Sequence, residues 1–334
     1  MIHKMAVQAN NNSLVIDLQK PEESGFAIKS IEGLGPVKAN INVGNFALSD
    51  GGRIVSSRLP TRNITIEMVF YEIFQPGSRA LSASTYRTAI KRETVEDLRQ
   101  KSYKYFGVQN TITLYFLTDN RYVAIEGIVE SNEPIIFGKE CGTKISVLCA
   151  NPYFVDVGND VGEIIFTSED PEFHFDFANI LSSSSDYNSK NYDETLKTLL
   201  MSMKNITTEI DFNYNGTTTS GVQIRLEFLS ADSGDIEISN MTEGTSMTVD
   251  ISKVETILGE SIAIGDSIVI DTTFGNKNIY INHADRNWNI LNALGRNCDW
   301  ISLVPGSNRI IYNALNGPER ISVSIMYRTL YNGI

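Results

Sequence analysis

The chain has 334 residues, 42% of them apolar, which is more than one hydrophobic core usually organises and enough to fill two. Its net charge of −12 and isoelectric point near 4.8 exclude a surface built to bind phosphate groups, so specific nucleic-acid binding is not expected. The three cysteines, Cys141, Cys149 and Cys298, are widely spaced with no CxxC pair, which excludes a disulfide framework and a cysteine-based zinc site.

The sequence gives no sign of a membrane segment or a leader. No stretch approaches the roughly 18 uninterrupted apolar residues of a membrane span, and the first residues lack the apolar core of a signal peptide. Together with the unpaired cysteines, this predicts synthesis in a reducing cytosol without membrane association.

The first part of the chain begins with short alternating segments typical of β-strands. Residues 13–18 and 26–31 flank a Pro-Glu-Glu turn, and residues 37–46 follow the glycine- and proline-rich break at 33–36. These segments predict an antiparallel sheet.

Residues 44–62 predict a polar, basic hairpin. Asp50 and the two glycines after it form its tip, because Asp-Gly pairs supply the positive φ angles that tight hairpin turns need. Arg53, Arg58 and Arg62 flank this tip in an otherwise acidic protein. The hairpin is interpreted either as a solvated excursion or as an arm that reaches a neighbouring subunit, and in the second case these four residues are the candidate interface.

A helix is predicted after the strand at 63–71. Thr94 and Asp97 have the spacing of a capping box, Val95 and Leu98 begin an apolar face, and Gly107 is a good stop. A hairpin of residues 111–117 and 122–130 follows. The first part is therefore expected to be a small antiparallel β-sandwich or barrel with one packed helix and a protruding hairpin.

The chain changes character between residues 135 and 157. Residues 144–149 alternate as a strand should, and the Asn-Pro pair then ends the strand, because proline cannot donate to a β-ladder. We place the domain boundary here, with domains at 1–153 and 154–334. The residues of the interdomain connection are Cys149, Asn151, Pro152 and Tyr153.

The second part is acidic and rich in Ser, Thr and Asn, with about nine short strands at regular spacing from residue 208 onward. This pattern predicts a two-sheet β-sandwich of jelly-roll type. Residues 182–192 have the low complexity of an exposed loop, and residues 192–204 have helical spacing. A helical insertion is thus expected at about 179–205.

No catalytic, nucleotide-binding or metal-binding motif occurs in its required context, so no enzyme activity, cofactor or metal is expected. His174 is more consistent with a solvated strand face than with a ligand, and Asp266 and Asp271 are weak candidates for a glycosidase pair. Trp288 and Trp300 could stack on a sugar, which leaves a carbohydrate-binding adhesin as the alternative function, although packing in the core or at its rim is favoured.

Several stretches resemble the distal tail (Dit) proteins of siphophages. The resemblance is strongest in GDIEISNMTEGTSMTVDISKV from Gly234, in WISLVPGSNRIIYNA from Trp300 and in the final ISVSIMYRTLYNGI. It extends to the first part, with its basic hairpin, its one helix and the strand that ends in CANPYF, and it is weakest at the insertion.

The resemblance implies a tail-tube-like first domain and a galectin-like second domain. It further implies a structural virion protein at the tail tip, which forms a homohexameric ring with DNA passing through its lumen. The hairpin at 44–62 would then be a belt around the neighbouring subunit. The expected partners are the tail tube protein, a tail-associated hub or lysin protein, and receptor-binding or other adhesion proteins.

Overall fold

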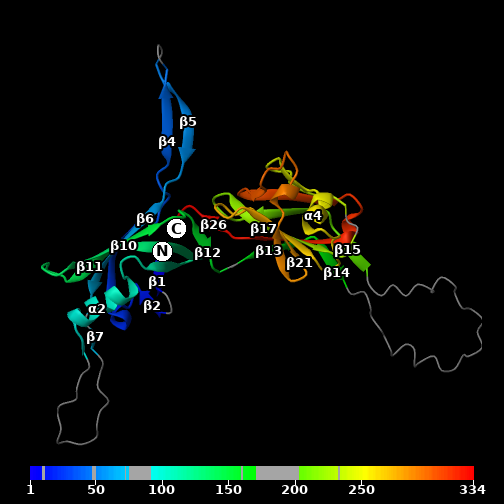
Figure 1. Cartoon of the computed structure of the whole chain (residues 1–334). Helices are drawn as coiled ribbons and strands as arrows, with labels where there is room; N and C mark the ends of the chain where they lie inside the picture. Colours follow the sequence, from blue (N-terminus) through cyan, green and yellow to red (C-terminus); the bar gives the residue numbers. More distant parts are fainter. Residues whose placement is uncertain are drawn as a thin grey trace, which may run out of the picture. The chain divides into compact units, whose positions relative to one another are not determined.

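The computed structural model describes residues 1–9, 12–46, 50–71, 73–74, 92–158, 161–170, 203–231 and 234–334. Over these residues the protein is mainly β, with antiparallel sheets and few helices, which confirms the predicted fold class (Figure 1). The chain forms two compact units. Unit 1 contains Met1–Asp160, Gly216–Thr218 and Arg328–Ile334, and unit 2 contains Val161–Asn215 and Thr219–Tyr327.

Unit 1 is built on one large sheet. Its main path runs β2-β1-β9-β10-β11-β6-β3, all neighbours are antiparallel, and β12 and β26 extend it from β10. The strands are β1 (Ile2–Ala9), β2 (Asn12–Asp17), β3 (Phe26–Glu32), β6 (Arg62–Phe70), β9 (Thr111–Thr118), β10 (Tyr122–Ile135), β11 (Gly142–Cys149), β12 (Phe154–Asp156) and β26 (Leu330–Tyr331).

Alternation along these strands fills one hydrophobic core. Ile64, Ile66 and Met68 of β6 are fully buried, as are Ile145 and Val147 of the neighbouring β11. Successive residues of a strand point to opposite faces, so each strand contributes every second side chain to this core and leaves the others on the outer face of the sheet.

The predicted helix is α2 (Val95–Tyr105). Thr94 Oγ1 accepts from the Asp97 backbone N–H, and the Asp97 carboxylate accepts from the Thr94 backbone N–H, so the capping box is confirmed. Leu98 and Ser102 are buried on its inner face. Unit 1 also contains the short helix α1 (Pro21–Ser24) and the two-residue strands β7 (Ile73–Phe74) and β8 (Arg92–Glu93).

The predicted hairpin is β4 (Asn40–Asn45) and β5 (Gly52–Arg58). These strands pair only with each other and form a two-stranded sheet that is separate from the main one. Figure 1 shows the pair as two blue arrows that extend from β6. The hairpin is therefore present and projects as expected, but it spans residues 40–58 and not 44–62, because the segment expected as a strand at 37–46 supplies its first strand and Arg62 belongs to β6.

Unit 2 is a two-sheet sandwich around one core. One sheet has the order β13-β25-β17-β20-β21-β22, with β23 on β17, and the other has the order β16-β24-β18-β19. The strands are β13 (Gly162–Ile165), β16 (Glu209–Tyr214), β17 (Ser220–Phe228), β18 (Ile236–Asn240), β19 (Thr245–Val249), β20 (Ser267–Asp271), β21 (Asn278–His283), β22 (Arg286–Asn289), β23 (Ser302–Leu303), β24 (Gly306–Ala314) and β25 (Ile321–Tyr327), with the separate pair β14 (Thr167–Asp170) and β15 (Met203–Ile206).

One element of unit 2 differs from the sequence expectations, and two further expected elements fall largely on residues that the structure does not describe. A helix that was not expected, α4 (Ile251–Leu258), follows β19, where the sequence pattern continued a strand to Ile251. The predicted helix at 192–204 and the predicted strand at 172–177 lie outside the described residues, except that Met203 and Lys204 belong to the strand β15. Unit 2 also contains the short helices η2 (Leu291–Ala293) and η3 (Pro318–Arg320).

The division of the chain also differs in detail from the boundary expected after Tyr153. β12 pairs with β10, and β26 near the C-terminus pairs with β12, so both strands belong to unit 1. Unit 1 thus takes residues from three separate parts of the sequence.

Candidate functional site

The hairpin β4–β5 is the first part of the candidate assembly site. Gly51 has φ +96 at its tip, as expected for the turn residue after Asp50. Asp50, Arg53 and Arg58 are all exposed. The structure therefore leaves these three predicted interface residues accessible.

One face of this hairpin is apolar. Ile41 and Val43 lie two residues apart on β4, and Val43 is the direct cross-strand partner of Ile54, so the three side chains share a face. They are 54%, 56% and 65% exposed. An exposed apolar face on a two-stranded sheet has nothing to stabilise it in water, and an isolated hairpin is at best marginally stable.

The opposite face is mainly polar and basic, although it also carries the exposed Val55 beside Gly44. Asn42 donates to Ser56 Oγ at 2.9 Å, and Arg53 and Arg58 extend from the same strand as Ser56. The register shifts between Asn42 and Val43, which is a β-bulge and increases the local twist of the hairpin.

Arg62 occupies a different environment from the other three predicted interface residues. Its side chain is buried, and its guanidinium lies 4.6 Å from the centre of the Phe154 ring. It donates to four backbone carbonyls of unit 1: to Pro152 through Nε (2.7 Å), to Gly33 and Gly35 through Nη1 (2.5 and 2.7 Å), and to Asn332 through Nη2 (2.5 Å).

Sequence reasoning grouped Arg62 with the exposed arginines because it was counted with the hairpin. It is in fact the first residue of β6 and falls on the same face as the buried Ile64 and Ile66. If the alternation of the strand at 63–71 is extended by one residue toward the N-terminus, it predicts that Arg62 is buried.

The predicted connection residues form a tight turn at the end of β11. Cys149 is fully buried, and burial raises the pKa of its thiol to about 11, so it is neutral and unreactive at neutral pH. The side-chain oxygen of Asn151 accepts from the Tyr153 backbone N–H at 3.1 Å, and Pro152 supplies its carbonyl to Arg62. These contacts fix the path of the chain from β11 into β12.

The C-terminal segment meets this connection inside unit 1. Phe154 pairs with Tyr331 and Val155 with Leu330, and the Tyr331 hydroxyl donates to Asp156 Oδ2 at 3.0 Å. The Arg121 guanidinium lies 4.3 Å over the Tyr331 ring. The outgoing strand β12 and the returning strand β26 therefore lie side by side.

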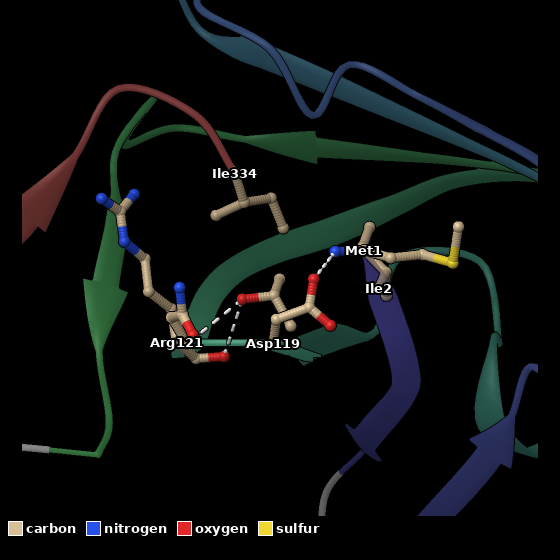
Figure 2. Close-up of a pocket in the computed structure, with 7 residues that line it drawn as sticks. Met1, Ile2, Asp119, Arg121 and Ile334 are labelled. Carbon is tan, nitrogen blue, oxygen red and sulfur yellow. Dashed lines mark hydrogen bonds and ion pairs between the residues drawn. The ribbon is translucent and has the colours of Figure 1, made fainter.

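A hollow of about 430 Å³ lies beside this junction (Figure 2). Figure 2 shows Ile334 and Arg121 on one side of the hollow, and Met1 with its amino group directed at the Asp119 carboxylate on the other. The Ile334 backbone N–H donates to the Leu34 carbonyl at 3.1 Å. Both ends of the chain are thus held against the sheet of unit 1.

The candidate chemical residues of unit 2 have structural partners. Lys277 lies 5.4 Å from the centre of the Trp300 ring, and Trp300 packs against the core, whereas Trp288 is 37% exposed on the edge strand β22. Asp271 accepts from the Thr273 backbone N–H and from the Asn276 side chain. His174 lies outside the described residues.

Sequence reasoning did not anticipate a histidine between two carboxylates in unit 2. His283 is buried, with Nδ1 2.6 Å from Asp266 Oδ2 and Nε2 2.9 Å from Glu260 Oε1. Its hydrogen bond to Asp266, followed by that to Glu260, raises the pKa of His283. Among the described residues, no group of three or more His, Cys, Asp and Glu side chains is arranged to hold a metal ion, and no helix is long and apolar enough to cross a membrane.

Comparison with known proteins identifies the fold. No family model matches the sequence, and no curated protein matches it. Among solved structures, the crystal structure of the Dit protein of phage SPP1, described as a paradigm of the hub adsorption apparatus of phages that infect Gram-positive bacteria, aligns with 98% of this chain and 98% of its own, with a TM-score of 0.57 and 11% identity.

Two baseplate structures in activated conformations also align. The phage P2 baseplate with Ca gives a TM-score of 0.45 at 10% identity over 100% of both chains, and the phage p2 baseplate with Sr gives 0.41 at 10% identity over 97% of both chains. The alignment with SPP1 Dit, which spans both units, confirms the resemblance expected from the sequence at the level of the fold. The chain has the fold of a phage distal tail protein.

Proposed function

We propose that this protein is the distal tail protein of a siphophage, a structural component of the virion at the tail tip. Unit 1 closes with copies of itself into a hexameric ring that continues the tail tube, and DNA passes through the lumen. Unit 2 presents a surface to which receptor-binding or other adhesion proteins attach. A tail-associated hub or lysin protein meets the ring on the side away from the tube.

The observation that supports this function best is the hairpin β4–β5. Its apolar face of Ile41, Val43 and Ile54 is exposed, and its two strands pair only with each other. Such an element becomes stable when a partner covers it. A contact between an arm of one copy and a different surface of the next is heterologous, and heterologous contacts close into rings when the rotation permits.

The overall charge fits a ring around DNA. A protein of net charge −12 does not retain the phosphate backbone, which suits a channel that DNA must leave quickly. The likeness to the SPP1 Dit fold over both units supports the same proposal, because that protein is described as the hub of an adsorption apparatus.

The mass of the purified chain in solution tests the proposal. Light scattering coupled to size exclusion is expected to give six times the chain mass of 37.1 kDa, and negative-stain images should show rings with a central hole. If the tube protein is required for closure, the ring is expected when the two are mixed. A monomer under both conditions would overturn the proposed function.

A hairpin-deleted variant isolates the cause of assembly. Replacing residues 40–58 by a short Gly-Ser linker is expected to give a monomer with the circular dichroism of the sheet unchanged, because β4 and β5 share no ladder with other strands. A variant that still forms the ring would show that another surface drives closure.

A further inference from the structure

The outer face of the large sheet of unit 1 carries an apolar row that crosses four strands. Val15 of β2 pairs with Ala6 of β1, Ala6 pairs with Tyr115 of β9, and Tyr115 pairs with Ala124 of β10. Their neighbours along each strand are in the core, so these four side chains point away from it. Val15 is 56% exposed.

Three members of this row, Val15, Ala6 and Tyr115, line a groove. A hollow of about 330 Å³ is lined by Lys4, Ala6, Val15, Tyr115, Leu117 and Tyr122. The Tyr115 and Tyr122 rings stack with their centres 5.8 Å apart, and the Tyr115 hydroxyl contacts the Gln8 side chain at 2.8 Å. The Tyr115 ring is therefore held in place and its hydroxyl already has a partner, so the stacked rings present a mainly apolar wall to the groove.

Polar side chains border the groove on both sides. Lys4 and Asp17 form an ion pair of 3.4 Å beside Leu117, and the row beyond Tyr115 contains Thr113 and Glu126. An apolar centre with a polar rim is the usual composition of a protein–protein contact.

We propose that the apolar face of the β4–β5 hairpin of one copy of this chain binds in this groove on the next copy. This proposal rests on the proposed function, since it names the surface that receives the arm. Ile41, Val43 and Ile54 are the side chains that enter the groove. They are apolar and exposed, and among the described residues the two hairpin strands have no ladder partner other than each other.

The charges on the two surfaces agree with this seating. The hairpin face with Ile41, Val43 and Ile54 also carries Ser57, the partner of Ile41, and no charged side chain among its described residues. Arg53 and Arg58 lie on the opposite face, so the Lys4 ammonium at the rim of the groove meets no like charge. The reverse seating would cover only one aliphatic side chain, Val55, would place two arginines beside Lys4 and would leave three aliphatic side chains in water.

A second exposed apolar pair on the same face of the sheet provides a matched control. Ile128 of β10 is the direct partner of Leu148 of β11, and the two are 51% and 42% exposed. They stand on the same outer face as Val15 but line no part of the groove. A non-specific apolar contact would use this pair as readily as the groove.

Cross-linking of two variants, each with one introduced exposed cysteine beside the fully buried Cys149, tests the contact. In a background with Cys141→Ser and Cys298→Ser, the Ile54→Cys chain is mixed with the Val15→Cys chain, assembled and oxidised. We expect a disulfide-linked dimer on a non-reducing gel that disappears on reduction, because a bond between different variants joins two copies. Mixing the Ile54→Cys chain with the Leu148→Cys chain should give at least tenfold less disulfide-linked dimer.

The outcomes separate this proposal from the proposed function. If a ring forms but position 15 gives no cross-link, or positions 15 and 148 cross-link equally, the groove contact is overturned. The proposed ring is not affected by either result. A double variant, Ile54→Cys with Val15→Cys, that oxidises only within one chain also overturns it, since the hairpin would then seat on its own sheet. Failure of the unmodified chain to assemble, alone and with the tube protein, overturns the proposed function itself.

A charge placed in the groove gives an independent test. Val15→Asp should abolish assembly, or raise the concentration needed for it at least tenfold, with unchanged thermal unfolding because the side chain is exposed. Leu148→Asp should assemble as the unmodified chain does. Equal assembly by both variants would contradict the proposal.

Discussion

Arg62 illustrates how one buried side chain can organise several segments. Its guanidinium joins the break at residues 33–35, the connection at Pro152 and the C-terminal segment at Asn332. A planar group with five donors suits this task, whereas lysine could not reach all four carbonyls at once.

Replacement of Arg62 by alanine should therefore destabilise unit 1 strongly. Four backbone carbonyls would lose their donor in a buried site, and we expect the free energy of unfolding to fall by about 3 kcal/mol or more. Urea denaturation followed by far-UV circular dichroism measures this change in the free energy of unfolding. Arg58→Ala, at an exposed position, should change the value by less than about 0.5 kcal/mol, and equal effects would refute this assignment.

His283 makes the stability of unit 2 dependent on pH. Its bonds to Asp266 and Glu260 raise its pKa in the folded state above the ordinary value of 6.5. The stabilisation is complete below the unfolded value and is lost as the pH rises through the folded value. We expect the melting temperature of unit 2 to fall as the pH increases above about 6.5, apart from the background slope of other groups.

His283→Gln is the matched control for this dependence, because glutamine keeps a donor but does not titrate. Thermal melts between mildly acidic and mildly basic pH should show that the variant lacks the step present in the unmodified chain. An identical pH profile in both proteins would rule out His283 as the source.

At the scale of single elements, the hairpin β4–β5 has the clearest dynamic consequence. Its strands are exposed on both faces and, within the described part of the chain, form a backbone ladder only with each other. In unassembled protein their amides should exchange with deuterium rapidly, whereas those of β6 and β11 in the core should be protected. Assembly is expected to slow exchange in the hairpin, and hydrogen-exchange mass spectrometry of both forms will show whether it does.

The helix α4 depends on its ends. The Asp250 carboxylate accepts from the Lys253 backbone N–H, and its hydrogen bond with the Ser252 hydroxyl, followed by that with Lys253, lowers the pKa of Asp250 to about 2. Asp250→Ala should cost about 1 kcal/mol of unit 2 stability in denaturant titrations. Asp299→Ala, at an exposed position outside this helix, serves as a comparison for loss of one surface carboxylate, and no difference between them would contradict the cap.

Local patterns explain which elements could be predicted. The alternation at 63–71 and 144–149 and the capping box at Thr94 each combine several agreeing signals, and the structure contains all three. The strand β1 was missed because its outward positions hold Lys4, Ala6 and Gln8, which alternate only weakly with Met5 and Val7. The helix α4 was missed because the strand pattern before Asp250 was extended to Ile251, which is already in the helix. Asp250 and Gly259 mark the two ends of this helix.

The site was predictable only where it is local in sequence. The basic hairpin and its tip could be recognised from Asp50 and its glycines. The burial of Arg62 among carbonyls from Gly33 to Asn332, and the groove between Val15 and Tyr122, depend on strand order, which no local pattern encodes.

At the scale of the whole molecule, unit 1 requires the last residues of the chain. β26 pairs with β12, Asn332 binds Arg62 through its carbonyl, and Thr217 binds Asn332 through its hydroxyl at 2.8 Å. A chain that ends at Thr329 should lose more than about 2 kcal/mol of unit 1 stability, since it loses these bonds and the burial of Tyr331.

Calorimetry can resolve that loss if the two units melt separately. Removal of Ile334 alone keeps β26 and Asn332 in place and should have a much smaller effect. A chain ending at Thr329 that melts like the complete one would show that the C-terminal segment only rests on unit 1.

The pairing of β12 with β26 has a consequence for how such proteins can diversify. The strand that leads into residues 161–327 and the strand that leads out of them are direct neighbours. That stretch is therefore an insertion whose two attachment points to unit 1 lie side by side. A foreign domain whose own termini lie close together could be spliced between them, provided that the loss of the Thr217 contacts is tolerated. Under the proposed function, recombination at these two points would exchange the domain that the tail tip displays and leave unit 1 unchanged.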